Sequence, residues 1–154
     1  MGRVVFALVV VLSSPSWGAE PPRPTPEQDL KTAQGRWRFD PKSGSLWDIN
    51  DPKEKVPALF RSMAVDGVVL AIDGNRLTVG KGEPISIAND LDFPNLQEQV
   101  EKAVRGQRLV LLTLASGKGL LASYSVDKDS LDIHYPAGCC SRSGHILVFR
   151  RVKE

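Results

Sequence analysis

The sequence predicts a mainly β protein: an antiparallel up-and-down barrel of about eight strands, with a short N-terminal helix and one amphipathic helix near residues 95–105. Apolar and polar residues alternate with a period of two in short runs along most of the chain, which is typical of half-buried strands. Turns rich in Gly, Asn and Asp connect most of these runs, so consecutive strands should pair antiparallel. Only one later stretch changes to clear helical spacing.

An export signal is expected at residues 1–19. Arg3 is the only charge there, and an apolar run follows it at residues 4–12. The run has the length of the apolar region of a secretory signal peptide, well short of the roughly 20 residues that span a bilayer. We therefore expect cleavage after Gly18 or Ala19, no membrane span afterwards, and an exported protein that is periplasmic or extracellular.

A Pro-rich linker is expected at residues 20–25, because closely spaced prolines favour an extended, solvated chain. The barrel domain then covers residues 26–154, a length that buries a sizeable core in one domain. Thr25 and Gln28 have the spacing of a capping box, with a proline at the first helical position between them. A short helix is therefore predicted to run to Ala33.

The first strand should follow directly. Trp37 and Phe39 alternate with arginines, a pattern that predicts a strand with both aromatic rings facing the core. Residues 40–57 are rich in turn-forming residues and are expected to be a loop that uses Leu46 and Trp47 as a plug.

Residues 57–63 are expected to form one or two helical turns before the pattern becomes steadily β. A hairpin is predicted from residues 68–72 and 76–79, and a further strand from residues 84–88. In residues 95–105 apolar residues recur at helical spacing between an Asn cap and a Gly stop. This helix should pack its apolar stripe on the sheet or across one end of the barrel.

The last third of the chain is the most regular. Four strands are predicted at residues 108–115, 120–126, 131–135 and 145–152, joined by two short turns and a longer loop at residues 136–144. With the earlier runs this makes about eight strands, enough to close a barrel that leaves no exposed edge.

Three parts of the chain resemble the lipocalin-like proteins of planctomycete type, a mostly uncharacterised family of secreted domains. They are residues 29–37, with Asp-Leu-Lys and then Gly-Arg-Trp; residues 72–79, Ile-Asp-Gly-Asn-Arg-Leu-Thr-Val; and the C-terminal segments 120–131 and 147–151. Together they span nearly the whole mature chain, although residues 40–63 and 95–105 depart from the pattern. The resemblance implies a lipocalin-like barrel, and the family supplies no established ligand.

Gly35 and Trp37 also resemble the Gly-x-Trp signature that opens lipocalin barrels. The resemblance implies that the indole closes one barrel end and that a basic residue of the last strand, here Arg150 or Arg151, lies across it. A guanidinium over an indole face contributes about 0.5 to 2 kcal/mol. We therefore expect a structural clasp, not a catalytic site.

Charge and motifs argue against several classes of function. The formal net charge of +2 falls to +1 when Arg3 leaves with the signal peptide, and both signs are interspersed, so no nucleic-acid partner is expected. The sequence contains no Gly-x-Ser-x-Gly elbow, His-Glu-x-x-His motif, phosphate-binding loop or dinucleotide fingerprint. We expect no enzyme and no cofactor.

The histidines and cysteines of the sequence all lie within residues 134–145: His134, Cys139, Cys140 and His145. Such a set can ligate zinc or copper, although adjacent cysteines are an unusual chelate. In an oxidising compartment the cysteines can also form a disulfide with each other or with another chain. A metal site, a vicinal disulfide, a free thiol pair of structural or redox character and an intermolecular disulfide all remain open.

Strand register decides whether the two histidines converge. His134 follows Ile133 of the expected inward face, so it should point to solvent. His145 points the same way only if Ile146, Val148 and Arg150 of its strand face inward. If Leu147 and Phe149 face the core, the histidines diverge.

The leading hypothesis is a secreted binding module for a small apolar ligand. A competing hypothesis is a non-enzymatic structural or protein-interaction domain of the cell envelope, and a third, more remote one is a redox or metal site at the His/Cys loop. In the leading hypothesis the cavity residues are the expected inward side chains Trp37, Phe39, Leu70, Ile72, Leu77, Ile87, Leu111, Tyr124, Ile133 and Val148.

Overall fold

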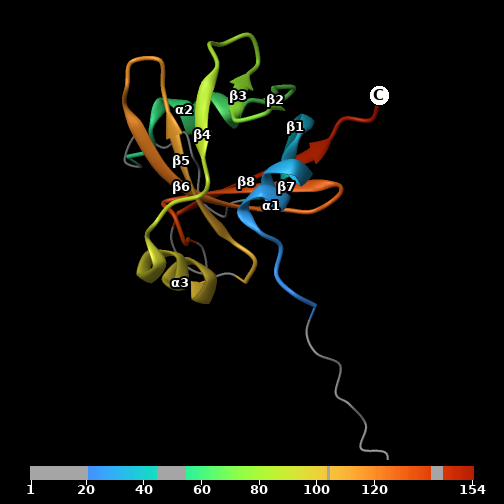
Figure 1. Ribbon diagram of the computed structural model, residues 1–154. Helices are drawn as coiled ribbons and strands as arrows, with labels where there is room; N and C mark the ends of the chain where they lie inside the picture. Colours follow the sequence, from blue (N-terminus) through green and yellow to red (C-terminus); the bar gives the residue numbers. More distant parts are fainter. Residues whose placement is uncertain (1–20, 45–54, 104, 140–143) are drawn as a thin grey trace, which may run out of the picture.

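The computed structural model describes residues 21–44, 55–103, 105–139 and 144–154 (Figure 1). Several expectations lie outside these residues: the signal peptide at 1–19, the plug formed by Leu46 and Trp47, and Cys140. Among the helices of the described residues, none is long and apolar enough to cross a membrane.

Eight antiparallel strands close into a barrel in which each strand pairs with the next along the chain and the last pairs with the first. The strands are β1 (Gly35–Gly44), β2 (Val69–Asp73), β3 (Arg76–Val79), β4 (Ile85–Ala88), β5 (Arg108–Thr113), β6 (Gly119–Val126), β7 (Ser130–Tyr135) and β8 (His145–Arg151). The predicted fold class, a mainly β up-and-down barrel, is confirmed.

The largest difference from the predicted boundaries lies in β1. Strand β1 continues to Gly44, although residues 40–57 were expected to be a loop. The reason is pairing: after a break in register following Phe39, β1 pairs again with β8 through Gly44 and Leu147. A bulge of this kind allows a strand to continue through residues whose composition is typical of turns.

Two short helices lie at opposite ends of the barrel. Helix α1 (Pro26–Ala33) begins at the predicted capping box, in which the Gln28 backbone N–H donates to Thr25 Oγ1 over 3.2 Å. Helix α2 (Ala58–Met63) inserts Phe60 and Met63, both 0% exposed, into the core at the other end.

The third helix, α3 (Pro94–Ala103), packs against the outside of the barrel and lies apart from α1 and α2 in Figure 1. The Gln97 side chain fixes it to the start of β5: its Oε1 accepts from Leu109 N over 3.0 Å and its Nε2 donates to Gln107 O over 3.0 Å. Val100 is buried against Gly138, where an added Cβ would lie 3.2 Å from a Val100 methyl. Of the two expected placements, the sheet face is the observed one.

Two residues expected to face the interior lie on the outer face instead. On β5 the inward residues are Val110 and Leu112, which places Leu111 outside. On β8 Leu147 and Phe149 belong to the core, so the intervening Val148 also faces outward. Both errors have one cause: these strand segments are apolar at every position, so alternation does not identify the inward face.

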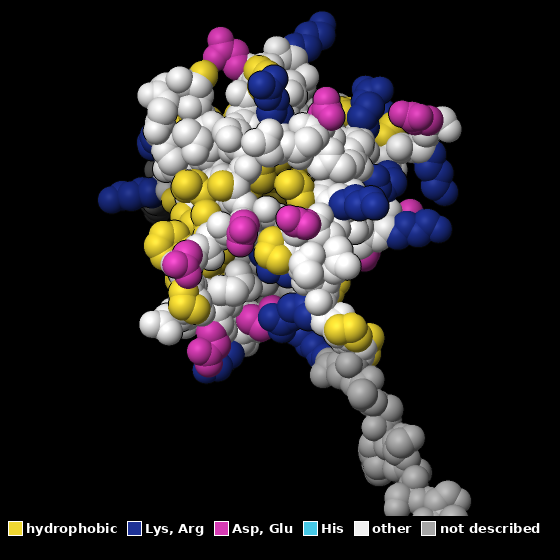
Figure 2. All heavy atoms as spheres, in the orientation of Figure 1, with side chains coloured by type: hydrophobic (Ala, Val, Ile, Leu, Met, Phe, Trp, Pro, Cys, Tyr) yellow, Lys and Arg dark blue, Asp and Glu magenta, His cyan; other side chains and the backbone are white. Residues whose placement is uncertain are grey.

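The surface carries charges of both signs. Figure 2 shows Lys and Arg side chains beside Asp and Glu side chains around hydrophobic side chains that gather near the middle of this face. The interspersed charge agrees with the near-neutral balance of the sequence.

Candidate functional site

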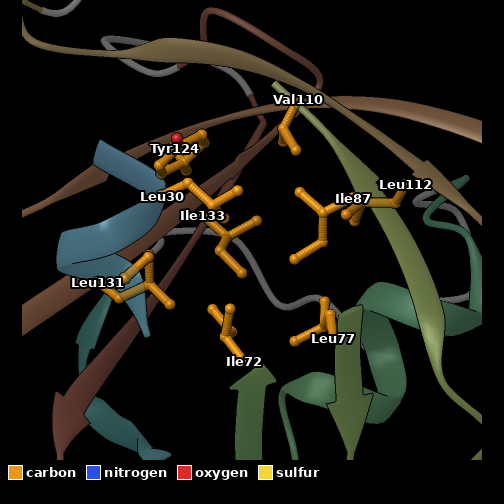
Figure 3. Close-up of a pocket in the computed structure, with 10 residues that line it drawn as sticks. Leu30, Ile72, Leu77, Ile87, Val110, Leu112, Tyr124, Leu131 and Ile133 are labelled. Carbon is orange, nitrogen blue, oxygen red and sulfur yellow. The ribbon is translucent and has the colours of Figure 1, made fainter. Parts of the chain in front are cut away.

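An apolar cavity of about 40 Å³ lies inside the barrel beneath α1. Its lining side chains come from α1 and from six of the strands and point toward a common space (Figure 3). The lining residues are Leu30, Ala33, Ile72, Leu77, Ile87, Val110, Leu112, Tyr124, Leu131 and Ile133. All except Tyr124 are hydrocarbon side chains, and Tyr124 contributes its ring while its hydroxyl points away from the cavity.

Half of the expected cavity residues line this space: Ile72, Leu77, Ile87, Tyr124 and Ile133. The other expected residues do not. Trp37 and Leu70, both 0% exposed, fill the core elsewhere, and Phe39 is half-buried against Phe149, with ring centroids 5.6 Å apart. Leu111 and Val148 lie on the outer face.

Sequence reasoning missed five lining residues. Leu30 and Ala33 stand three positions apart on the predicted helix, and this spacing places them on one face. That signal was sufficient to predict which side of α1 meets the barrel. Val110 and Leu112 lie in a strand whose inward face could be chosen only after the register was known, whereas Leu131 lies two positions before Ile133 and so shares its expected inward face.

The cavity is small for a ligand site. An apolar cavity of about 150 Å³ binds benzene, and sites for larger organic ligands usually exceed about 300 Å³. At about 40 Å³ the closed barrel holds only a few heavy atoms. A larger guest requires a lining element to move, and α1 is the lining element that does not belong to the sheet.

The C-terminal end of α1 is held by the expected clasp. The Arg151 guanidinium lies 4.0 Å from the ring centroid of Trp37. It also donates to two carbonyl oxygens at this end of the helix, Thr32 O at 2.6 Å and Gln34 O at 2.8 Å. Of the two expected basic residues it is therefore Arg151 that lies over the indole, whereas Arg150 faces outward and pairs with Asp40 at 3.2 Å.

The N-terminal end of α1 is held by an ion pair and a hydrogen-bonded amide. Arg108 Nε of β5 lies 2.5 Å from Asp29 Oδ2 of the helix. Asn89 Nδ2 donates to Pro26 O over 2.7 Å and to the Tyr124 hydroxyl over 2.9 Å. Burial of Tyr124 raises the pKa of its phenol, so this hydroxyl stays protonated at the mouth of the cavity.

The expectation that His134 points to solvent is wrong: it faces outward from the barrel but is only 3% exposed. The loop after β7 and the chain before β5 cover it, through a network that sequence reasoning missed. Gln107 Nε2 contacts His134 Nδ1 at 3.2 Å and donates to Cys139 O over 2.9 Å. Ser123 Oγ donates to Gln107 Oε1 over 2.5 Å and accepts from Gly138 N over 2.9 Å.

The two histidines diverge, as expected for a β8 that turns Leu147 and Phe149 inward. His134 is opposite Ile146, and His145 is opposite Tyr135, so the rings lie on different faces of the sheet. Cys139 is disulfide-bonded, so its sulfur is not a thiolate ligand. Within the described residues, which exclude Cys140, no three His, Cys, Asp or Glu side chains are grouped to hold a metal ion.

No known protein family, curated protein or solved structure matches this chain.

Proposed function

We propose that the chain is an exported, lipocalin-like binding module for a small apolar ligand, and that the cavity beneath α1 is its binding site. One observation carries the proposal: a closed barrel keeps an interior space lined by hydrocarbon side chains and one phenol ring. Removing apolar ligand surface from water contributes about 25 cal/mol per Å², so such a space favours an apolar guest.

Ligand entry in this proposal requires α1 to tilt away from the barrel. Its C-terminal end is fixed by Arg151 and continues directly into β1 through Gly35, whose φ of +111° suits glycine. Its N-terminal end is held mainly through polar side-chain contacts, from Arg108 and Asn89. A rotation about Gly35 that breaks these contacts would withdraw Leu30 and enlarge the cavity.

The proposal is tested by titrating the purified chain with 1-octanol and following the methyl resonances of Ile72, Val110 and Ile133 by NMR. We expect saturable shifts in these methyl groups. Leu30→Ala should strengthen binding severalfold, because it removes side-chain volume from α1, which acts as the lid of the cavity. The absence of saturable shifts in both the native chain and Leu30→Ala would overturn the proposal.

A matched control is available at the other barrel end. Leu59 is also a half-buried leucine on a short end helix, α2, and it does not line this cavity. Leu59→Ala should therefore leave octanol binding unchanged. If Leu59→Ala strengthened binding as much as Leu30→Ala, the gain would come from general loosening of the barrel and not from the lid.

The alternative of an envelope interaction domain has less support. Among the described residues the large apolar side chains that stand exposed are Val65 at 52% and Phe93 at 53%, in different connecting segments. Single exposed apolar residues are normal on soluble domains. A lack of octanol binding would favour this alternative.

A further inference from the structure

An arginine, Arg108, stands at an inward-facing position of β5. Arg108 precedes the cavity residues Val110 and Leu112 at a spacing of two, and it pairs with Tyr124, whose ring also lines the cavity. Its side chain is only 13% exposed. A charged side chain at such a position costs several kcal/mol unless a counter-ion accompanies it.

The counter-ion comes from the lid. Asp29 of α1, with a side chain 16% exposed, places Oδ2 2.5 Å from Arg108 Nε. Arg108 Nη2 also donates to Pro24 O over 2.7 Å, just before the helix. When the N-terminal end of α1 lifts, Arg108 loses both contacts and remains at the mouth of the apolar cavity with no carboxylate.

The mouth carries two further polar groups. The Tyr124 hydroxyl accepts a hydrogen bond from Asn89 and still has its own hydrogen to donate. Lifting α1 also releases the Asn89 amide hydrogen that now binds Pro26 O. The open site therefore combines an apolar interior with a rim made of one cation and two hydrogen-bond donors.

We propose that this site binds an alkyl carboxylate, with the hydrocarbon tail in the cavity and the ligand's carboxylate in the place of Asp29 on Arg108. The inference rests on the proposed function, since it uses the same cavity and the same lid. Asp29 already shows which group fits Arg108, because it presents a carboxylate to the guanidinium at hydrogen-bonding distance. Asp29 is then a built-in competitor that keeps the lid closed until a ligand replaces it.

The test compares n-octanoate with 1-octanol, which has the same chain length but no charge, by calorimetry on two variants. Asp29→Asn and Arg108→Gln each break the same ion pair, so both loosen α1. Only Arg108→Gln also removes the cation that would hold the ligand. Octanoate should bind Asp29→Asn about tenfold or more tightly than Arg108→Gln, while octanol binds both variants equally.

Two controls accompany the comparison. Glu27→Gln removes a negative charge from the exposed side of the same helical turn and should leave octanoate binding within about twofold of the native chain. Arg108→Lys keeps the positive charge and should keep most of the preference for octanoate. If circular dichroism shows that Arg108→Gln does not fold, Arg108→Met, which keeps an unbranched side chain without the charge, takes its place in the comparison.

The outcomes separate the two proposals. Equal octanoate affinity in Asp29→Asn and Arg108→Gln, with octanol still binding, would overturn the carboxylate inference and leave the apolar site standing. If neither probe binds any folded variant, the binding function itself is overturned.

Discussion

The indole N–H of Trp37 donates to Ala33 O over 2.8 Å, while the Arg151 guanidinium covers the same ring at 4.0 Å from its centroid. One aromatic side chain thus joins the last turn of α1, the first strand and the last strand. It closes the barrel seam where β1 meets β8, and it fixes the end of α1 about which we expect the lid to turn.

Trp37→Ala should destabilise the fold by about 3 to 5 kcal/mol, because the ring is 0% exposed and its loss leaves a large cavity. The thermal midpoint should fall by about 10 °C or more. Phe93→Ala is the control, since Phe93 is 53% exposed and its loss should leave the midpoint nearly unchanged. An unchanged midpoint in Trp37→Ala would contradict the barrel-closing role.

Arg151→Gln and Arg150→Gln should differ clearly in chemical unfolding, although the residues are neighbours. Arg151 donates to two backbone carbonyls at the end of α1 and lies over a buried indole, so its loss should lower the free energy of unfolding by about 2 kcal/mol. Arg150 forms an ion pair with Asp40 while its own side chain is 54% exposed, and its loss should cost less than about 1 kcal/mol. Equal losses would contradict the assignment of the clasp to Arg151.

The sequence was sufficient to predict the barrel because most strands alternate and most turns are short. The Gly-x-Trp resemblance also pointed to Trp37 and to a basic residue over its ring, but it left Arg150 and Arg151 open, and the structure places Arg151 there. The inward face of β5 was not, because residues 109–112 are apolar throughout: one face meets the cavity and the other includes Leu109, 1% exposed. When both faces of a strand are apolar, the alternation of apolar and polar residues that would identify its inward face is absent.

The burial of His134 was unpredictable for a related reason. Alternation correctly places the ring on the outer face, but it does not show that the chain before β5 and the loop after β7 cover that face. Gln107 and Ser123 carry no motif either. Their role follows only from tertiary contacts between segments that are distant in sequence.

Ser123→Ala should cost about 1 to 3 kcal/mol of unfolding free energy, because it leaves Gln107 Oε1 and Gly138 N without their buried partner. Ser125 provides a matched control: it lies on the same outer face of β6, opposite Asp132, and it is partly exposed. Ser125→Ala should change the unfolding free energy by no more than about 0.5 kcal/mol. Urea titrations of the two variants measure the difference, and similar losses would contradict a structural role for the network.

Acid should destabilise the protein through His134. Burial lowers the pKa of its imidazole below the ordinary 6.5, and this effect outweighs the opposing ones of the Asp132 carboxylate and the Cys139 backbone. Above pH 6.5 neither the folded nor the unfolded chain binds this proton. As the pH falls below 6.5, the unfolded chain binds a proton at His134 that the folded chain does not bind. The free energy of unfolding therefore decreases until the pH reaches the lowered pKa of His134 in the folded chain.

The expected slope approaches, at most, about 1.4 kcal/mol per pH unit for one proton. Urea unfolding of the native chain at several pH values between about 7 and 5 measures it, and His134→Gln supplies the comparison because glutamine does not titrate. The variant should be less stable at pH 7, since the contact with Gln107 changes, but its curve should be flatter over this range. If the native chain and His134→Gln lost stability in parallel, the proton would be taken up elsewhere, and the buried neutral imidazole would not be the group that senses acid.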